Sequence, residues 1–172
     1  MISEQMQQAF NDQINAELYS AYLYASMSAY YQSVNLPGFA SWMRIQVQEE
    51  MLHATFMFDF VLARGGRLTL QPIAGPPAEW PNPRQPFVDA YTHETLVTQR
   101  IDNLVNLAVA ERDHASTAFL QWFITEQVEE EANADKVVKQ MQFAGEGSGL
   151  FMIDRDLATR IFTPPVNPPI GG

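Results

Sequence analysis

The chain has 172 residues, of which 47% are hydrophobic, and this size predicts one compact domain with a sizeable core. Its formal net charge of −10 argues against binding to nucleic acid, whose phosphates require a basic surface, and favours the attraction of cations. The absence of cysteine excludes disulfides, iron–sulfur clusters and thiolate zinc sites.

The N-terminal stretch MISEQMQQAF has neither the basic start nor the apolar segment of a signal peptide. No uninterrupted run of 18 apolar residues marks a membrane span. We therefore expect a cytoplasmic protein without a membrane partner.

Helical periodicity predicts four long helices along the chain. The first covers residues 3–34, and the second begins at Pro37 and ends at the glycine pair 65–66. The third covers 86–112, and the fourth covers 115–143. After the break GEGSG, a fifth and shorter helix is predicted for 150–162, which closes a domain of residues 1–162. The tail TPPVNPPIGG, residues 163–172, is too rich in proline to continue it and should be extended.

The connections between these helices predict the topology. Short links make the first and second helices antiparallel neighbours, and likewise the third and fourth. The segment 65–85 is rich in glycine and proline and too long for a tight turn. A helix of about 28 residues is roughly 42 Å long, and an extended linker of this length can span it. The expected fold is all-α: a four-helix bundle with one long crossover and a short fifth C-terminal helix.

Each of the four long patterns places an acidic residue in an otherwise mostly apolar face. These residues are Glu17, Glu50, Glu94 and Glu130. In the third helix the predicted buried face is Phe87, Tyr91, Glu94, Thr98, Ile101 and Val105. His53 lies one turn after Glu50, and residues three apart share one face of a helix.

The polar positions repeat at a spacing of 77 residues. Glu94 lies 77 after Glu17, Gln127 lies 77 after Glu50, and Glu130 lies 77 after His53. Glu126 stands in the same relation to Glu49. The two helical pairs therefore bring their polar residues to one level of the bundle.

Buried carboxylates require neutralisation, and two like charges about 4 Å apart repel by about 4 kcal/mol at an effective dielectric of about 20. None of the ten lysines and arginines lies in the four predicted faces near the acids. Two divalent cations would balance the four carboxylates, and His53 supplies a neutral nitrogen ligand. Such an oxygen-rich set with one imidazole suits iron or manganese better than copper, and the absence of thiolates disfavours a structural zinc site.

The segments NAELYSAYLY (15–24), QEEMLHA (48–54), HETLVTQRI (93–101) and FLQWFITEQVEEE (119–131) resemble bacterial non-haem ferritins. The resemblance covers nearly the whole chain and implies a ferritin-like bundle. It implies that Glu17, Glu50 and His53 bind one iron, that Glu50, Glu94 and Glu130 bind a second, and that Glu50 bridges them. Gln127 would lie beside the pair.

The same resemblance implies a third iron site at Glu49, Glu126, Glu129 and Glu130. It also places Tyr24 near the di-iron centre as an electron donor, a role that Trp122 could share. The alternative for the acidic cluster is a solvated helix face, and the alternative for the two aromatic residues is ordinary packing.

The implied activity is that of a ferroxidase, which oxidises Fe(II) to Fe(III) with O₂ or H₂O₂. The implied assembly is a hollow homo-24-mer in which the mineral is stored. Where animal ferritins line a channel with acidic residues, this chain has Thr117 and Leu120, so the sequence leaves the route of iron into the shell open.

Other functions remain as alternatives. Met51 falls where bacterioferritins place a haem ligand, but methionines in a helical stripe are usually packing residues, so haem is not expected. Bacterioferritins also carry a second E-x-x-H motif, which here reads Gln127-Val128-Glu129-Glu130, and this favours the non-haem branch. A different di-iron carboxylate oxidase usually has two such motifs as well. A DNA-protecting miniferritin is opposed by the net charge.

Overall fold

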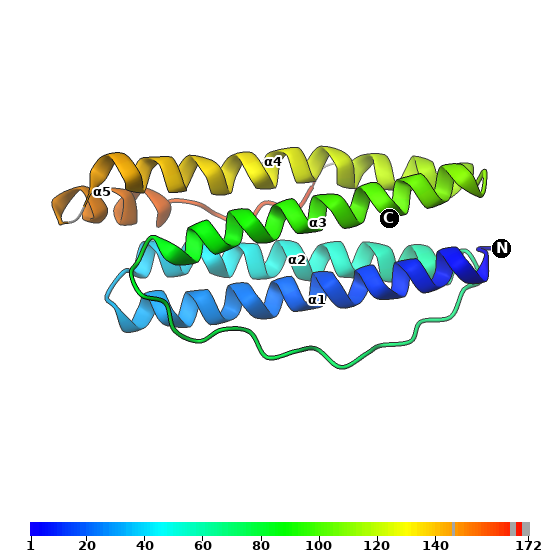
Figure 1. Cartoon of the computed structure of the whole chain (residues 1–172), viewed down its shortest axis with the longest axis horizontal. Coiled ribbons are helices and arrows are strands. Elements are labelled where there is room, and N and C mark those ends of the chain that lie inside the picture. The colour runs from blue at the N-terminus through cyan, green and yellow to red at the C-terminus, as the bar shows by residue number, and fades with distance from the viewer. Residues whose placement is uncertain (146, 166–167, 170–172) are drawn as a thin grey trace.

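The structure, a computed structural model, describes residues 1–145, 147–165, 168 and 169. All regular structure in this part is helical (Figure 1), with the order α1 (Glu4–Ser33), α2 (Pro37–Ala63), α3 (Gln85–Ala110), α4 (His114–Ala144) and α5 (Ser148–Leu157). The all-α bundle with a short fifth helix is thus confirmed. None of the described helices combines the length and the hydropathy needed to cross a membrane.

The first four helices begin and end within a few residues of the predicted positions. Ser3 caps α1, since its hydroxyl accepts a 3.0 Å hydrogen bond from the Met6 amide, and Pro37 occupies the first turn of α2. The prediction of 150–162 for the fifth helix was wrong at both ends. The helix starts directly after Gly147, which has a φ of 97°, and it ends before Arg160, whose side chain reaches across to α2.

The two hairpins close with the same turn, displaced by 77 residues. In the first, the Leu36 amide donates to the Tyr31 carbonyl at 3.0 Å, and in the second the Asp113 amide donates to the Ala108 carbonyl at 2.8 Å. Asn35 (φ 60°) and Arg112 (φ 55°) take the left-handed position of this helix-ending motif. Matching turns place corresponding residues of the two hairpins at corresponding heights.

The crossover between α2 and α3 runs along the outside of α1 for the length of the bundle (Figure 1). Asn11 of α1 fastens it, because its amide donates to the Arg67 carbonyl at 3.2 Å and its oxygen accepts from the Thr69 amide at 3.1 Å. Further along, the Tyr31 hydroxyl donates to the Pro83 carbonyl at 2.7 Å. The crossover therefore returns the chain to the end at which α2 began, so that α3 runs parallel to α2.

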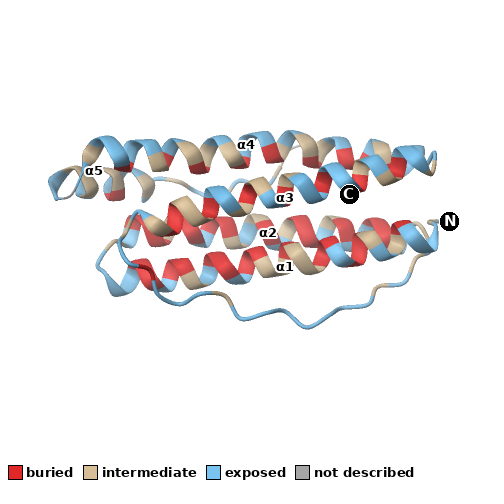
Figure 2. Ribbon diagram, in the orientation of Figure 1, coloured by how far each residue is buried: buried red, intermediate tan, exposed pale blue. Residues whose placement is uncertain are grey.

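The core consists of two apolar clusters separated by a polar band. One cluster, around Tyr31, Phe39 and Phe87, fills the end near the first hairpin turn. The other, around Phe10 and Phe119, fills the opposite end. Buried residues line the facing sides of the helices in Figure 2, and the crossover is largely exposed. Aromatic packing at both ends holds the helices around the band in the middle.

The predicted buried face of the third helix was partly wrong. Tyr91 is 37% exposed, whereas Ala90, Val97 and Leu104 are buried. The buried face of α3 is turned by one residue from the predicted face, because α3 packs against both α1 and α4. Glu94 belongs to both faces and is buried as expected.

Candidate metal centre

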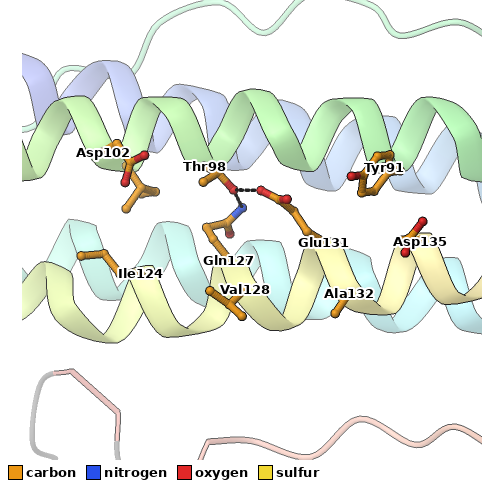
Figure 3. Close-up of a pocket in the computed structure, with 10 residues that line it drawn as sticks. Tyr91, Thr98, Asp102, Ile124, Gln127, Val128, Glu131, Ala132 and Asp135 are labelled. Carbon is orange, nitrogen blue, oxygen red and sulfur yellow. Dashed lines mark hydrogen bonds between the residues drawn. The ribbon is translucent and has the colours of Figure 1, made fainter.

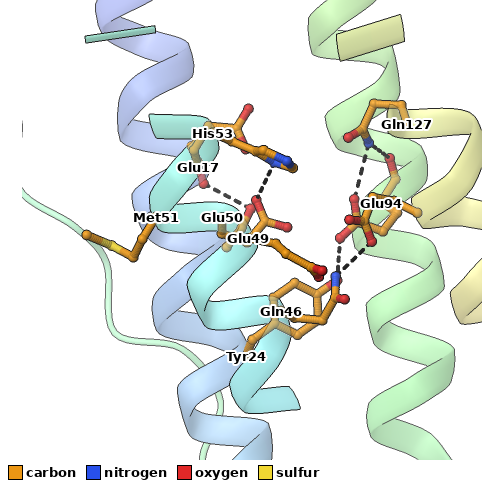
Figure 4. A network of polar contacts seen from close by, with 12 residues as sticks. Glu17, Tyr24, Gln46, Glu49, Glu50, Met51, His53, Glu94 and Gln127 are labelled. Atoms are coloured by element: carbon orange, nitrogen blue, oxygen red, sulfur yellow. Dashed lines mark hydrogen bonds and ion pairs between the residues drawn. The ribbon is translucent and has the colours of Figure 1, made fainter. Parts of the chain in front are cut away.

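Glu17, Glu50 and His53 form a compact group inside the first hairpin (Figure 4). Glu17 comes from the middle of α1, and the other two come from successive turns of α2. All three side chains are buried, and one ligand atom from each lies within 4.8 Å of the other two. This spacing suits a metal ion shared by the three side chains.

Glu94 and Glu130 supply the carboxylates of the second hairpin. The Glu94 carboxylate accepts a hydrogen bond from the Tyr24 hydroxyl and a 3.2 Å bond from the Gln127 amide. The Glu130 carboxylate accepts a 2.7 Å bond from the Gln46 amide. The two carboxylates and their three donors are all buried, so the structure brings the sequence-predicted ligands of α3 and α4 to the same polar band.

Burial shifts the proton affinity of the whole group. It raises the pKa of Glu17 and raises that of Glu94 to about 7. Burial and the neighbouring carboxylates hold the pKa of Glu50 and Glu130 well above the usual range. Burial lowers the pKa of His53 to about 4, so its imidazole is neutral at neutral pH and keeps a free lone pair.

Two carboxylate oxygens lack any hydrogen-bond partner among the described residues. They are Oε2 of Glu17 and Oε2 of Glu50, while the other Glu17 oxygen accepts a 2.7 Å bond from Gln13. The Nδ1 of His53 lies 3.6 Å from Oε2 of Glu50, too far for a hydrogen bond, and a neutral imidazole makes no ion pair. Unpaired buried oxygens beside a free imidazole nitrogen are what a cation would satisfy.

Lysine and arginine do not supply that cation. Within the described ranges, no lysine or arginine forms a salt bridge with Glu17, Glu50, Glu94 or Glu130. Arg100 donates at 3.1 Å to the Gln13 oxygen, and Arg160 donates at 2.5 Å to the Gln46 oxygen, so each reaches an amide rather than one of these carboxylates. The four acids must therefore hold protons or metal ions.

A second acidic group faces outward from the same band. Glu49 and Glu126 are half-buried and Glu129 is exposed, and all three line a cavity of about 260 Å³. The other walls of this cavity are Leu52, His53, Trp122 and residues 162–165 of the C-terminal segment. Burial, then Glu129 and Glu49, raises the pKa of Glu126. Glu49 is already held by Arg160, which donates to it at 2.7 Å.

The aromatic candidates lie on either side of the centre. Tyr24 is fully buried against Glu94, and its pKa is raised well above the usual range by burial and by the neighbouring carboxylates. The Trp122 ring stands edge-on to His53, with the ring centroids 5.5 Å apart. Met51, by contrast, is 46% exposed and points away from the carboxylates in Figure 4.

Several polar partners of the centre escaped prediction. Gln13 lies four residues before Glu17, on the same helix face, and donates to it at 2.7 Å. Gln46 lies four residues before Glu50, but its amide donates to Glu130 of α4 instead. The spacing was therefore a usable signal for the partner of Gln13 but not for that of Gln46. Arg160 was not predictable in this way, because its partner Glu49 is 111 residues away in the sequence.

Gln127 also opens onto the surface between α3 and α4 (Figure 3). A cavity of about 460 Å³ lies there, and its acidic lining comes from Asp102, Glu131 and Asp135. The Thr98 hydroxyl donates to Glu131 at 2.5 Å and accepts from Gln127 at 3.4 Å. Gln127 is thus shared between this cavity and Glu94.

The Ferritin-like domain family matches residues 7–144 of the chain. The chain belongs to this family. Over 160 residues it is 44% identical to the bacterial non-heme ferritin of Bacteroides fragilis (strain 638R). This match covers 93% of this chain and 100% of that protein. It is 36% identical to the bacterial non-heme ferritin of Escherichia coli O6:H1, covering 92% and 97% of the two chains.

Solved structures show the same relationship for this ferritin-like chain. It is similar to a ferritin of Archaeoglobus fulgidus engineered into a closed form, at 51% identity and a TM-score of 0.93, over 95% of this chain and 100% of that one. An open pore ferritin from the same archaeon gives 50% identity and a TM-score of 0.92, over 94% and 100%. These matches confirm the resemblance to bacterial non-haem ferritin and the ferritin-like fold.

Proposed function

We propose that this protein stores iron and acts as a ferroxidase. The family supports iron storage in general, and the observation that carries the proposal is the convergence of four buried carboxyl groups and a neutral imidazole from four helices. Iron is the substrate: Fe(II) binds at the centre, is oxidised there, and leaves as Fe(III) for deposition as a hydrated oxide.

In this proposal Glu17, Glu50 and His53 hold one iron, and Glu50, Glu94 and Glu130 hold the second. The short distances within the first group support the first assignment. The position of Glu50 supports its bridging role, since its pKa responds to the charges of both Glu17 and Glu94. Gln127 orients Glu94 by its 3.2 Å hydrogen bond.

The reaction balances with O₂ as oxidant: two Fe(II) each give one electron, and O₂ takes these and two protons to form H₂O₂. With H₂O₂ as oxidant, the two electrons and two protons yield two molecules of water. The chain's own contribution is to hold the reactants in a dry site and to exchange protons at its carboxyl groups. When only one Fe(II) is bound, Tyr24 can supply the second electron that O₂ takes; its phenolic proton passes to the Glu94 carboxylate and the side chain becomes a neutral tyrosyl radical.

A third iron site belongs to the proposal, at Glu49, Glu126, Glu129 and Glu130. The 260 Å³ cavity beside His53 supports it, because three of these carboxylates line that cavity. Glu130 would connect this site to the centre.

We further propose that the chains assemble into a hollow homo-24-mer in the cytoplasm. Large apolar side chains stand exposed on α1, α2 and the crossover, among them Tyr22, Phe58, Leu62 and Leu70. Exposed apolar surface of this kind suits contact with further copies of the chain.

The test compares Fe(II) oxidation under air by the parent and by Glu50→Gln. The parent should form the ferric product rapidly and keep it in solution, whereas the variant should lose this activity. Glu79→Gln, an exposed glutamate of the crossover, is the matched control and should behave as the parent. Size-exclusion chromatography verifies that each variant assembles as the parent does. Unchanged oxidation and storage by Glu50→Gln would refute the assigned centre.

A further inference from the structure

The segment after the fourth helix is anchored to the start of α2. The Asp154 carboxylate of α5 accepts hydrogen bonds from the backbone amides of Gly38 at 2.7 Å and Phe39 at 3.0 Å. A Cβ atom at position 38 would lie 1.7 Å from the Asp154 carbonyl oxygen, so glycine is required there. A buried carboxylate at a helix N-terminus fixes α5, and α5 in turn sets the position of Arg160.

Arg160, three residues after α5, lies against one face of α2. Its Nη2 donates to both oxygens of Glu49, at 3.0 and 2.7 Å, and its Nη1 donates to the Gln46 oxygen at 2.5 Å. Its Cζ lies 4.7 Å from the centroid of the Trp42 ring. Trp42, Gln46 and Glu49 are spaced by four and three residues, so they form one stripe that receives the guanidinium.

This arrangement connects the C-terminal segment to the metal centre. Gln46 is fully buried and uses its amide to hold Glu130 at 2.7 Å while its oxygen accepts from Arg160. Arg160 therefore binds one proposed third-site ligand, Glu49, directly and reaches a ligand of the centre, Glu130, through one amide. Beyond Arg160, residues 162–165 form a wall of the cavity that Glu49, Glu126 and Glu129 also line.

We propose that Arg160 is a positioning residue that competes with metal ions for Glu49. This inference rests on the proposed function, since it concerns how iron uses the third site. The guanidinium engages both oxygens of Glu49, so a cation can take this carboxylate as a ligand only when the Arg160–Glu49 pair opens. Its positive charge also opposes a cation in the cavity.

The consequence is a weakened third site beside a strong centre. An ion held loosely by Glu126 and Glu129 moves on more readily than one held by three or four carboxylates. Arg160 thereby favours passage of iron over its retention at this cavity.

The experiment measures Tb³⁺ binding to the assembled protein by luminescence sensitised through tryptophan, for which Trp122 in the cavity wall is well placed. Arg160→Gln should bind the cavity Tb³⁺ about fivefold more tightly than the parent, because a paired cation is removed. Arg160→Lys keeps the positive charge but loses the planar guanidinium that contacts Glu49 and Gln46 together, so its affinity for Tb³⁺ should rise about twofold. Arg155→Gln is the matched control, since Arg155 is exposed and its only ion pair within the described part of the chain is with Asp156.

The gain must come from the cavity and not from the centre. Adding Glu126→Gln to Arg160→Gln should return the affinity to the parental value or below. The inference is overturned if Arg160→Gln binds Tb³⁺ no more tightly than the parent. It is also overturned if the tighter binding persists when Glu126→Gln is added. If Arg160→Gln fails to assemble, Arg160→Lys decides by the same criterion.

Failure of this inference is separable from failure of the proposed function. The Tb³⁺ gain depends on Glu126, whereas Fe(II) oxidation depends on Glu50. If Arg160→Gln binds Tb³⁺ no more tightly than the parent while Glu50→Gln still loses Fe(II) oxidation, only the role of Arg160 is refuted. If Glu50→Gln still oxidises Fe(II) as the parent does, the proposed centre is refuted.

Discussion

The two hairpins contribute unlike halves to the proposed metal centre, although their turns match at a displacement of 77 residues. In the α1–α2 half, Glu17 and Glu50 each keep one oxygen that no described residue pairs by a hydrogen bond. In the α3–α4 half, donors hold both carboxylates: Tyr24 and Gln127 for Glu94, and Gln46 for Glu130. The first half therefore has an unmet demand for a cation, and the second half is positioned in advance by the protein itself.

Replacing a carboxylate of the unpaired half should produce the largest effect. Glu17→Gln removes an oxygen ligand and a charge, and truncating one partner of a buried charge pair costs about 3 kcal/mol, which is more than a hundredfold in affinity. Calorimetric titration with Zn²⁺, a redox-inert probe, measures the loss. Zn²⁺ affinity within threefold of the parental value would mean that the unpaired oxygens are not ligands.

The second prediction concerns stability without metal. Burial raises the pKa of Glu94 from 4.5 to about 7, so between these values the folded state binds more protons than the unfolded state and the stability contributed by this group falls as pH rises. In chelator-treated protein, Glu94→Gln should therefore be more stable than the parent by about 3 kcal/mol at pH 8 and equal to it at pH 4.5.

Chemical denaturation at several pH values measures this difference. Comparing the parent with Glu94→Gln at each pH removes the opposing contribution of His53, whose lowered pKa acts equally in both proteins. A difference that does not grow with pH would contradict the account. Saturating Zn²⁺ should reverse the order, because a bound cation replaces the proton on Glu94.

The donors of the positioned half should matter less than the ligands. Gln46→Leu leaves Glu130 without its amide donor, and loss of such a supporting partner typically weakens metal binding about tenfold. Gln48→Leu is the control on the same helix, because Gln48 is exposed and its side chain donates to the Arg44 carbonyl, away from the carboxylates of the band. Equal Zn²⁺ affinities for the two variants would show that Gln46 does not position Glu130.

Tyr24→Phe should have the smallest effect on structure. It removes one hydrogen bond to Glu94 and should lower stability by about 1 kcal/mol, measured by denaturation. Fe(II) oxidation should continue, but a tyrosyl radical seen by electron paramagnetic resonance in the parent should be absent from the variant. A radical of unchanged intensity would assign the electron to another residue.

The sequence predicted the parts of the molecule that depend on local periodicity. Four long helices, the crossover and the burial of Glu17, Glu50, Glu94 and Glu130 follow from residues spaced by three and four along each helix. The one-residue error on α3 arose because its neighbours, rather than its own pattern, decide which face is buried.

The C-terminal segment shows what local patterns leave out. The fifth helix was placed two residues late at its start and five residues late at its end, because it ends at Leu157, before the contacts that Arg160 makes with α2. The same contacts give Glu49 a partner 111 residues away, which no spacing indicates. The division into residues 1–162 and 163–172 stays a prediction, because residues 166, 167 and 170–172 lie outside the described part.

Anomalous diffraction at the iron edge, from crystals loaded with Fe(II) without oxygen, tests the centre most directly. Two strong peaks are expected in each chain. One should lie between Glu17, Glu50 and His53, and the other beside Glu94 and Glu130. A polar band with no anomalous density, its carboxyl groups paired with one another through protons, would contradict the proposed centre.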